Sequence, residues 1–226
     1  MLSVSLIERT LETRDYDRLL RDLSDNGLAL PLSIRLRFGQ APTAPLALAL
    51  RRLVELTYGP TTLSRRLVDR LIRDQNPDGS FSSDQDPSAP GNDETPGGPG
   101  NGDRDPLTTA VVLAGLGRVA ADHPATVGDE LQTSLDRGYA ALAELQDCDG
   151  LFSAPSDRSL ADRALTSAFI VSLLGPDPRF RGAVRLSELH QWFEARDGRL
   201  DRQTQHLWDL ARISIHDVFE PLVFAA

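Results

Sequence analysis

The chain has 226 residues, of which 40% are hydrophobic and 25% charged, enough for one compact domain or two small ones. A formal net charge of -9 disfavours broad electrostatic attraction to nucleic acid or to anionic membranes. No apolar run is long enough to span a membrane, and acidic residues interrupt the N-terminus before a secretory segment forms. We therefore expect a cytoplasmic protein, and the single cysteine, Cys148, agrees with a reducing compartment.

Hydrophobic residues recur at helical spacing along most of the chain, and the alternating runs typical of strands are missing. The pattern predicts an all-α fold in which amphipathic helices alternate with apolar ones. Residues 1–60 are predicted to form an irregular helical part of the same domain, and 61–215 to form repeats. The predicted helices cover 61–75 and 107–121, then 133–146 and 164–174, and more faintly 186–195 and 203–215.

A short turn motif repeats between the helices of each pair. QNPDGSF and QDCDGLF carry Gln, Asp, Gly and Phe at the same offsets, EARDGRL (194–200) keeps Asp and Gly, and Asn26-Gly27-Leu28 resembles a degenerate fourth copy. Asp-Gly gives a tight reversal, the Gln amide is expected to cap groups at helix ends, and the Phe to pack back over the turn. We predict that these structural turns consist of Gln75, Asp78, Gly79, Phe81, Gln146, Asp149, Gly150 and Phe152.

The first repeat is longer than the second. LTTAVVLAGLG (107–117) aligns with LTSAFIVSLLG (165–175), and the preceding segment holds about 13 more residues in the first repeat. The extra residues lie within Ser82–Asp105, a stretch rich in Pro, Gly, Ser and Asp that predicts a flexible solvated loop, with a lid over a cavity as the functional alternative. Its carboxylates do not follow calcium-loop spacing. Gly115-Leu116-Gly117 is expected to mark the end of the apolar helix.

The pattern Q-x-x-D-G-x-F, followed by a helix that opens with L-T-[TS]-A, resembles the QW-type repeats of the squalene-hopene cyclase, class II terpene cyclase and protein prenyltransferase β-subunit superfamily. The resemblance covers roughly 61–215. It implies an α/α toroid, in which amphipathic outer helices surround apolar inner ones.

The catalytic residues of that superfamily do not carry over with the resemblance. Class II cyclases protonate a terpene with the middle Asp of D-x-D-D, and the corresponding position here holds Leu107, which has no proton to donate. Asp103-Arg104-Asp105 lies just upstream but out of register. The D-D-x-x-D motif of diphosphate-ionising synthases is absent from the sequence.

Protein prenyltransferases hold zinc with Asp, Cys and a distant His, a resemblance that nominates Asp147 and Cys148. The histidine would be His190, His206 or His216. Here the Asp and Cys are adjacent and lie inside the structural turn, so we expect no metal site and no cofactor.

The N-terminal ends of the two clear apolar helices carry arginines and hydroxyls suited to an anion such as a diphosphate. The alternative is that the hydroxyls simply cap these helices. The candidate ligand-binding residues are Arg104, Thr108, Thr109, Arg163, Thr166 and Ser167.

Three or four repeats are fewer than a closed toroid of this superfamily uses, so we expect an open arc or half-barrel. The ends of an arc expose apolar helices, which predicts a homo-oligomer or a protein partner. Two functions remain open. One is a non-catalytic binding or scaffold protein that uses its concave face for a protein or an apolar ligand. The other is an isoprenoid-related transferase, cyclase or accessory subunit.

Overall fold

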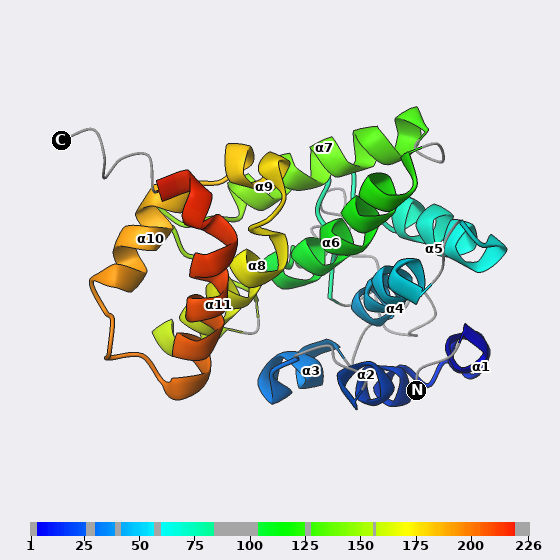
Figure 1. Cartoon of the computed structure of the whole chain (residues 1–226), viewed down its shortest axis with the longest axis horizontal. Helices are drawn as coiled ribbons and strands as arrows, with labels where there is room; N and C mark the ends of the chain where they lie inside the picture. The colour runs from blue at the N-terminus through cyan, green and yellow to red at the C-terminus, as the bar shows by residue number, and fades with distance from the viewer. Residues whose placement is uncertain are drawn as a thin grey trace, which may run out of the picture.

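The computed structural model describes residues 4–25, 30–38, 42–56, 60–83, 104–124, 128–155 and 157–219. Within these ranges the regular structure is helical throughout, and the only β-type pairings are two isolated bridges (Figure 1). The all-α prediction is confirmed for this part of the chain. None of its helices is both long and apolar enough to cross a membrane.

The described helices follow one another in the order α1 (Val4–Thr13), α2 (Tyr16–Asp25), α3 (Leu32–Phe38), α4 (Thr43–Leu56), α5 (Thr62–Arg73), α6 (Pro106–Asp122), α7 (Asp129–Glu144), α8 (Leu160–Leu174), α9 (Pro178–Ala183), α10 (Leu186–Glu194) and α11 (Arg202–Phe219). The six helices predicted from periodicity correspond to α5, α6, α7, α8, α10 and α11.

Most of the described helices pack in two rows, an inner and an outer one. In the inner row α4 contacts α6, α6 contacts α8, and α8 contacts α11. In the outer row α5 contacts α7 and α7 contacts α9, while α4 also touches α5 and α6 touches α7. The rows run along the long axis of the molecule, with α5 towards one end and α10 and α11 at the other (Figure 1).

Buried hydrophobic side chains join these elements into one cluster that extends from Ile7 to Ile215. The outer helix α5 buries Leu67 and Leu71 on one stripe and leaves Arg65 and Arg66 exposed, as its amphipathic pattern predicts. The inner helices α6 and α8 are buried on most sides, which explains their nearly uncharged sequences.

The prediction that Gly115 and Gly117 mark a helix end is wrong, because α6 continues to Asp122. Gly115 instead lets two inner helices approach closely. A Cβ atom at this position would lie 2.7 Å from the carbonyl oxygen of Ala47 in α4.

The N-terminal part, predicted to be helical but irregular, contributes four helices, and α4 is a full member of the inner row. The far side of α4 is covered by α2, which packs against it. Two predictions fall outside the described residues: the degenerate turn at 26–28 and most of the insertion within 82–105.

Candidate functional site

The first repeated turn, Gln75–Phe81, closes on itself through short-range hydrogen bonds. Asp78 accepts hydrogen bonds from the backbone N–H and the hydroxyl of Ser80, at 2.9 and 2.7 Å. Asn76 and Gly79 are joined by a backbone hydrogen bond of 2.9 Å, and Gly79 has a φ of +93°. The turn therefore needs Asp and Gly for the local reasons that the sequence indicates.

The same turn also docks on the next outer helix, α7. The Gln75 amide donates to the carbonyl oxygen of Gly79 and to that of Ser134, both at 2.9 Å. Arg137 of α7 reciprocates by donating to the carbonyl oxygens of Asn76 and Pro77, at 2.9 and 2.6 Å. These bonds connect consecutive repeats.

Gly79 lies directly against the backbone of α7. A Cβ atom added to Gly79 would lie 2.3 Å from the carbonyl oxygen of Arg137. Glycine is thus required twice here, once for the positive φ and once for the close approach.

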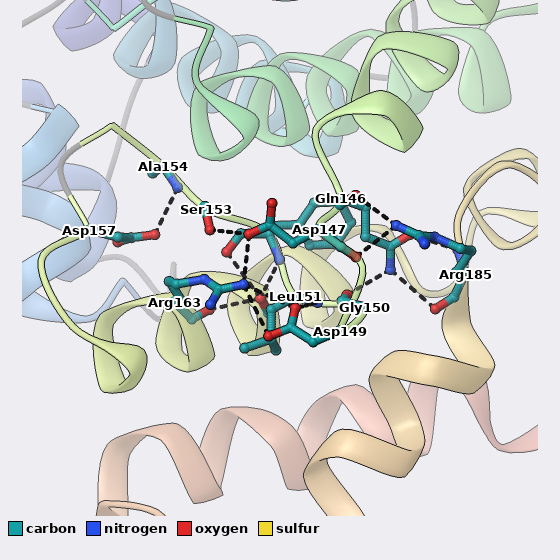
Figure 2. Close-up of polar contacts among 12 residues, drawn as sticks. Gln146, Asp147, Asp149, Gly150, Leu151, Ser153, Ala154, Asp157, Arg163 and Arg185 are labelled. Carbon is teal, nitrogen blue, oxygen red and sulfur yellow. Dashed lines mark hydrogen bonds and ion pairs between the residues drawn. The ribbon is translucent and has the colours of Figure 1, made fainter.

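The second turn, Gln146–Phe152, repeats this arrangement against the start of α10 (Figure 2). The Gln146 amide donates to the carbonyl oxygens of Gly150 and Arg185, at 2.7 and 3.1 Å, and its oxygen accepts the N–H of Arg185 at 2.8 Å. The Arg185 guanidinium donates back to the carbonyl oxygens of Gln146 and Asp147, both at 2.7 Å. Gly150 has a φ of +84°, and a Cβ there would lie 2.6 Å from the nitrogen of Leu189.

The helix-end cap expected of both glutamines is found at Gln146 and not at Gln75. Gln146 does reach a helix end, because Arg185 is the N-cap residue of α10. Gln75 instead reaches the carbonyl of Ser134 inside α7. In both turns the side chain links two repeats.

Each turn is also tied to the inner helix of its own repeat. The backbone N–H of Phe81 donates to the hydroxyl of Thr109 at 3.0 Å, and that of Phe152 to the hydroxyl of Ser167 at 2.9 Å. Both phenylalanines are fully buried. Thr109 and Ser167, two of the candidate ligand-binding residues, thus hold the turn.

The candidate arginines are bound to carboxylates of the turns. Arg104 Nε lies 2.6 Å from Asp78 Oδ2, and Arg163 Nη2 lies 2.7 Å from Asp147 Oδ2 and 3.0 Å from Asp149 Oδ1. The structure thus places Arg104 and Thr109 at the first turn, and Arg163 and Ser167 at the second. The two remaining candidates bond elsewhere, Thr108 to Asp105 and Thr166 to Asp157.

Asp105 is the N-cap residue of α6. One carboxylate oxygen accepts the N–H of Leu107 at 3.0 Å, and the other accepts the N–H and the hydroxyl of Thr108 at 3.2 and 2.6 Å. Burial raises the pKa of Asp105 above its usual value, although these hydrogen bonds and the charge of Arg37 oppose the rise. Leu107 is fully buried.

A buried ion pair that the sequence does not reveal lies at the N-terminal end of α8. Arg37 of α3 forms an ion pair with Asp157, whose side chain is 1% exposed, and donates to the Thr166 hydroxyl at 2.9 Å. Thr166 donates to Asp157 Oδ1 at 3.1 Å, and Asp157 Oδ2 accepts the N–H of Ala154 at 2.8 Å. Arg37 therefore fastens the N-terminal part to the repeats.

The insertion leaves and returns at one place. Ser82 and Arg104 form an antiparallel bridge, and the N–H of Asp105 donates to the carbonyl oxygen of Phe81 at 3.1 Å. The two ends of the insertion thus meet beside the first turn.

Metal-binding residues do not converge in the part of the chain that the structure describes: no group of three His, Cys, Asp or Glu side chains is placed to hold an ion. Asp147 is engaged with Arg163, and Cys148 is exposed at the tip of the second turn. The rings of His190 and Trp208 lie near one another, with centroids 5.9 Å apart and planes tilted by 59°.

Comparisons of the chain with protein-family models, with curated proteins and with solved structures find no match.

Proposed function

We propose that the chain is a non-catalytic scaffold protein, an open arc of helical repeats related to those of the terpene cyclase and prenyltransferase superfamily, which acts in the cytoplasm by binding a polypeptide partner. One observation carries the proposal: the arginines suited to a diphosphate are already paired with carboxylates of the repeated turns. If either arginine bound a diphosphate instead, its ion pair with the turn would be broken and the turn carboxylates would lose their partner.

The position of the missing acid supports the same reading. Leu107 cannot transfer a proton, and both oxygens of the nearby Asp105 are engaged as hydrogen-bond acceptors at the start of α6. This capping role explains why the carboxylate of Asp105 is buried.

Exposed leucines on α3 support a polypeptide partner. Leu32 and Leu36 of α3 are 57% and 64% exposed, although residues one or two positions away, such as Ile34, belong to the core. Apolar side chains at such positions are suited to docking a partner. The concave face of the arc is the other binding surface that the repeat architecture offers, either for a polypeptide or for an apolar ligand.

A second function, an isoprenoid-related transferase, cyclase or accessory subunit, is favoured by one observation. Burial raises the pKa of Asp105, which lies two residues before the position of a cyclase acid, and a raised pKa is a property that general acids share.

Titration calorimetry with farnesyl diphosphate separates the two functions. The scaffold proposal predicts no saturable binding to the wild-type protein. Saturable binding that is lost in Arg104→Ala or Arg163→Ala, but kept in Arg118→Ala, would establish the second function instead. Arg118 is a matched control because it pairs with Asp122 at the opposite end of α6.

A further inference from the structure

Each repeat in the described chain is completed by the outer helix that follows it. The first turn docks on α7 through Gly79, and the second docks on the start of α10 through Gly150. Among the inner helices, α4 contacts α5 and α6 contacts α7. In the first repeat the turn and the inner helix α6 thus form one surface that receives α7.

The third repeat ends in such a surface with no described helix on it. Gly198 has a φ of +72°, as its counterparts do, but a Cβ there would meet no atom within 4 Å. On α11, Leu210 is 41% exposed and Ile213 is 75% exposed.

The register of α11 shows which of its side chains an outer helix would cover. Asp201 caps α11 and accepts the Thr204 hydroxyl at 2.5 Å, just as Asp105 caps α6 and accepts that of Thr108. This equivalence aligns Ile213 with Gly117. A Cβ at Gly117 would lie 3.6 Å from the Tyr139 hydroxyl of α7 and 3.5 Å from Oδ2 of Asp177, the N-cap residue of α9. Ile213 therefore stands at a position that elements of the outer row cover in the first repeat.

The opposite end of the molecule carries a helix with the matching features. Counting back from Gln75 and Gln146 aligns Arg66 of α5 with Arg137, the residue that donates to the preceding turn. Arg65, Arg66 and Arg73 are exposed and form no ion pair or side-chain hydrogen bond with any residue that the structure describes. Such a basic face is unusual in a chain with a net charge of -9.

We propose that the partner of this scaffold is a second copy of the chain, docked head to tail: α5 of one copy packs on the third turn and α11 of the next. Arg66 donates to carbonyl oxygens of the third turn, as Arg137 does to the first, and lies near the exposed Asp197. The inference rests on the proposed repeat scaffold. The two surfaces lie at opposite ends of the long axis (Figure 1), so the contact is heterologous.

Sedimentation velocity of the full chain over a range of concentrations tests this contact. The wild-type mass should rise from one chain to two and more as the concentration increases. Arg66→Glu and Ile213→Asp should each remain single chains, whereas Arg9→Glu and Leu160→Asp, which change exposed residues elsewhere, should associate as the wild type does.

Mixing the two defective variants is the sharpest step. Each retains one intact surface, so an equimolar mixture of Arg66→Glu and Ile213→Asp should form a dimer that grows no further. Continued self-association of Arg66→Glu alone would show a symmetric contact between α11 helices and overturn the proposal.

A wild-type protein that stays a single chain would also overturn it. If such a protein bound anionic lipid vesicles and Arg66→Glu did not, the basic face of α5 would be a membrane contact instead. Failure to associate would overturn the head-to-tail contact alone if the protein also binds no farnesyl diphosphate, because the proposed scaffold function would then still stand. Saturable binding of farnesyl diphosphate would contradict the scaffold function itself.

Discussion

The two docked turns and the open third turn share a sequence motif but differ in what surrounds them. Gly79 and Gly150 are buried against the backbone of the next outer helix, whereas Gly198 is exposed and touches nothing at that position. The third copy also has Glu194 in place of Gln. The comparison shows that Asp-Gly makes the reversal, while the Gln and the lack of a Cβ atom serve the contact between repeats.

The largest expected difference lies in the glycines. Gly79→Ala and Gly150→Ala should each destabilise the fold by about 4 kcal/mol, because the strain of a positive φ adds to a backbone overlap. Gly198→Ala, with the strain alone, should cost about 1 kcal/mol. Urea unfolding of the three variants measures the difference, and equal losses would show that the close approach of the first two glycines is unimportant.

The glutamines should give the next largest difference. Gln146→Ala removes bonds to Gly150 and Arg185 in a buried place and should lower the free energy of unfolding by about 2–3 kcal/mol. Glu194→Ala, at the equivalent exposed position, breaks contacts with Arg212 and should cost less than about 1 kcal/mol. The contrast would be refuted if Glu194→Ala proved as damaging as Gln146→Ala under the same denaturant titration.

The hydroxyls that hold the phenylalanine amides should have a smaller effect. Thr109→Val keeps the shape of the side chain but leaves the buried N–H of Phe81 without its acceptor, at a cost of about 1–2 kcal/mol. Thr109→Ser keeps the hydroxyl and serves as the control. Thermal unfolding should rank Ser above Val at this position, and the reverse order would mean that packing of the methyl group outweighs the hydrogen bond.

Much of the fold could be predicted from the sequence because it depends on local patterns. The spacing of apolar residues predicts the helices α5, α6, α7, α8, α10 and α11, and the repeated motif predicts the turns. By contrast α4 was not recognised as an inner helix, although Pro45 lies in its first turn, where proline is compatible with a helix. Propensity rules assign glycine to helix ends, so they also misplaced Gly115, whose role depends on the neighbouring α4.

The site was less accessible to prediction because its members are brought together by folding. Arg37 and Asp157 are separated by 120 positions in the chain, and no local pattern pairs them. The motif alignment did identify Thr109 and Ser167 as equivalent positions, whereas Arg104 and Arg163 are one position out of register in it. It could not show that their partners are the carboxylates and amides of the turns.

The smallest expected effects concern the pH dependence of two equivalent helix caps. Burial raises the pKa of Asp105, so its native carboxyl binds a proton more readily than in the unfolded chain. Stability is therefore lost as the pH rises from the ordinary aspartate pKa of about 4 through the raised value. Relative to Asp105→Asn, the wild type should become less stable across that interval.

Asp201 should show the opposite sign. Burial alone would raise its pKa, but hydrogen bonds from Thr204 and from the backbone lower it overall. Its contribution to stability is present above a pH of about 4 and is lost as the pH falls through the lowered value. The free energies of unfolding of Asp105→Asn and Asp201→Asn, each referred to the wild type between acid and neutral pH, should diverge in opposite directions. Parallel curves would contradict the assigned environments.

Residue-resolved hydrogen exchange at low protein concentration tests most directly the claim that the turns fasten consecutive repeats. The amides of Phe81 and Phe152, buried and bound to the hydroxyls of Thr109 and Ser167, should exchange slowly, close to the rate of global unfolding. The amides of the third turn, around the exposed Gly198, should exchange much faster. Similar protection in all three turns of a single chain would contradict this claim, because the third turn has no following repeat in the described chain to which it could be fastened.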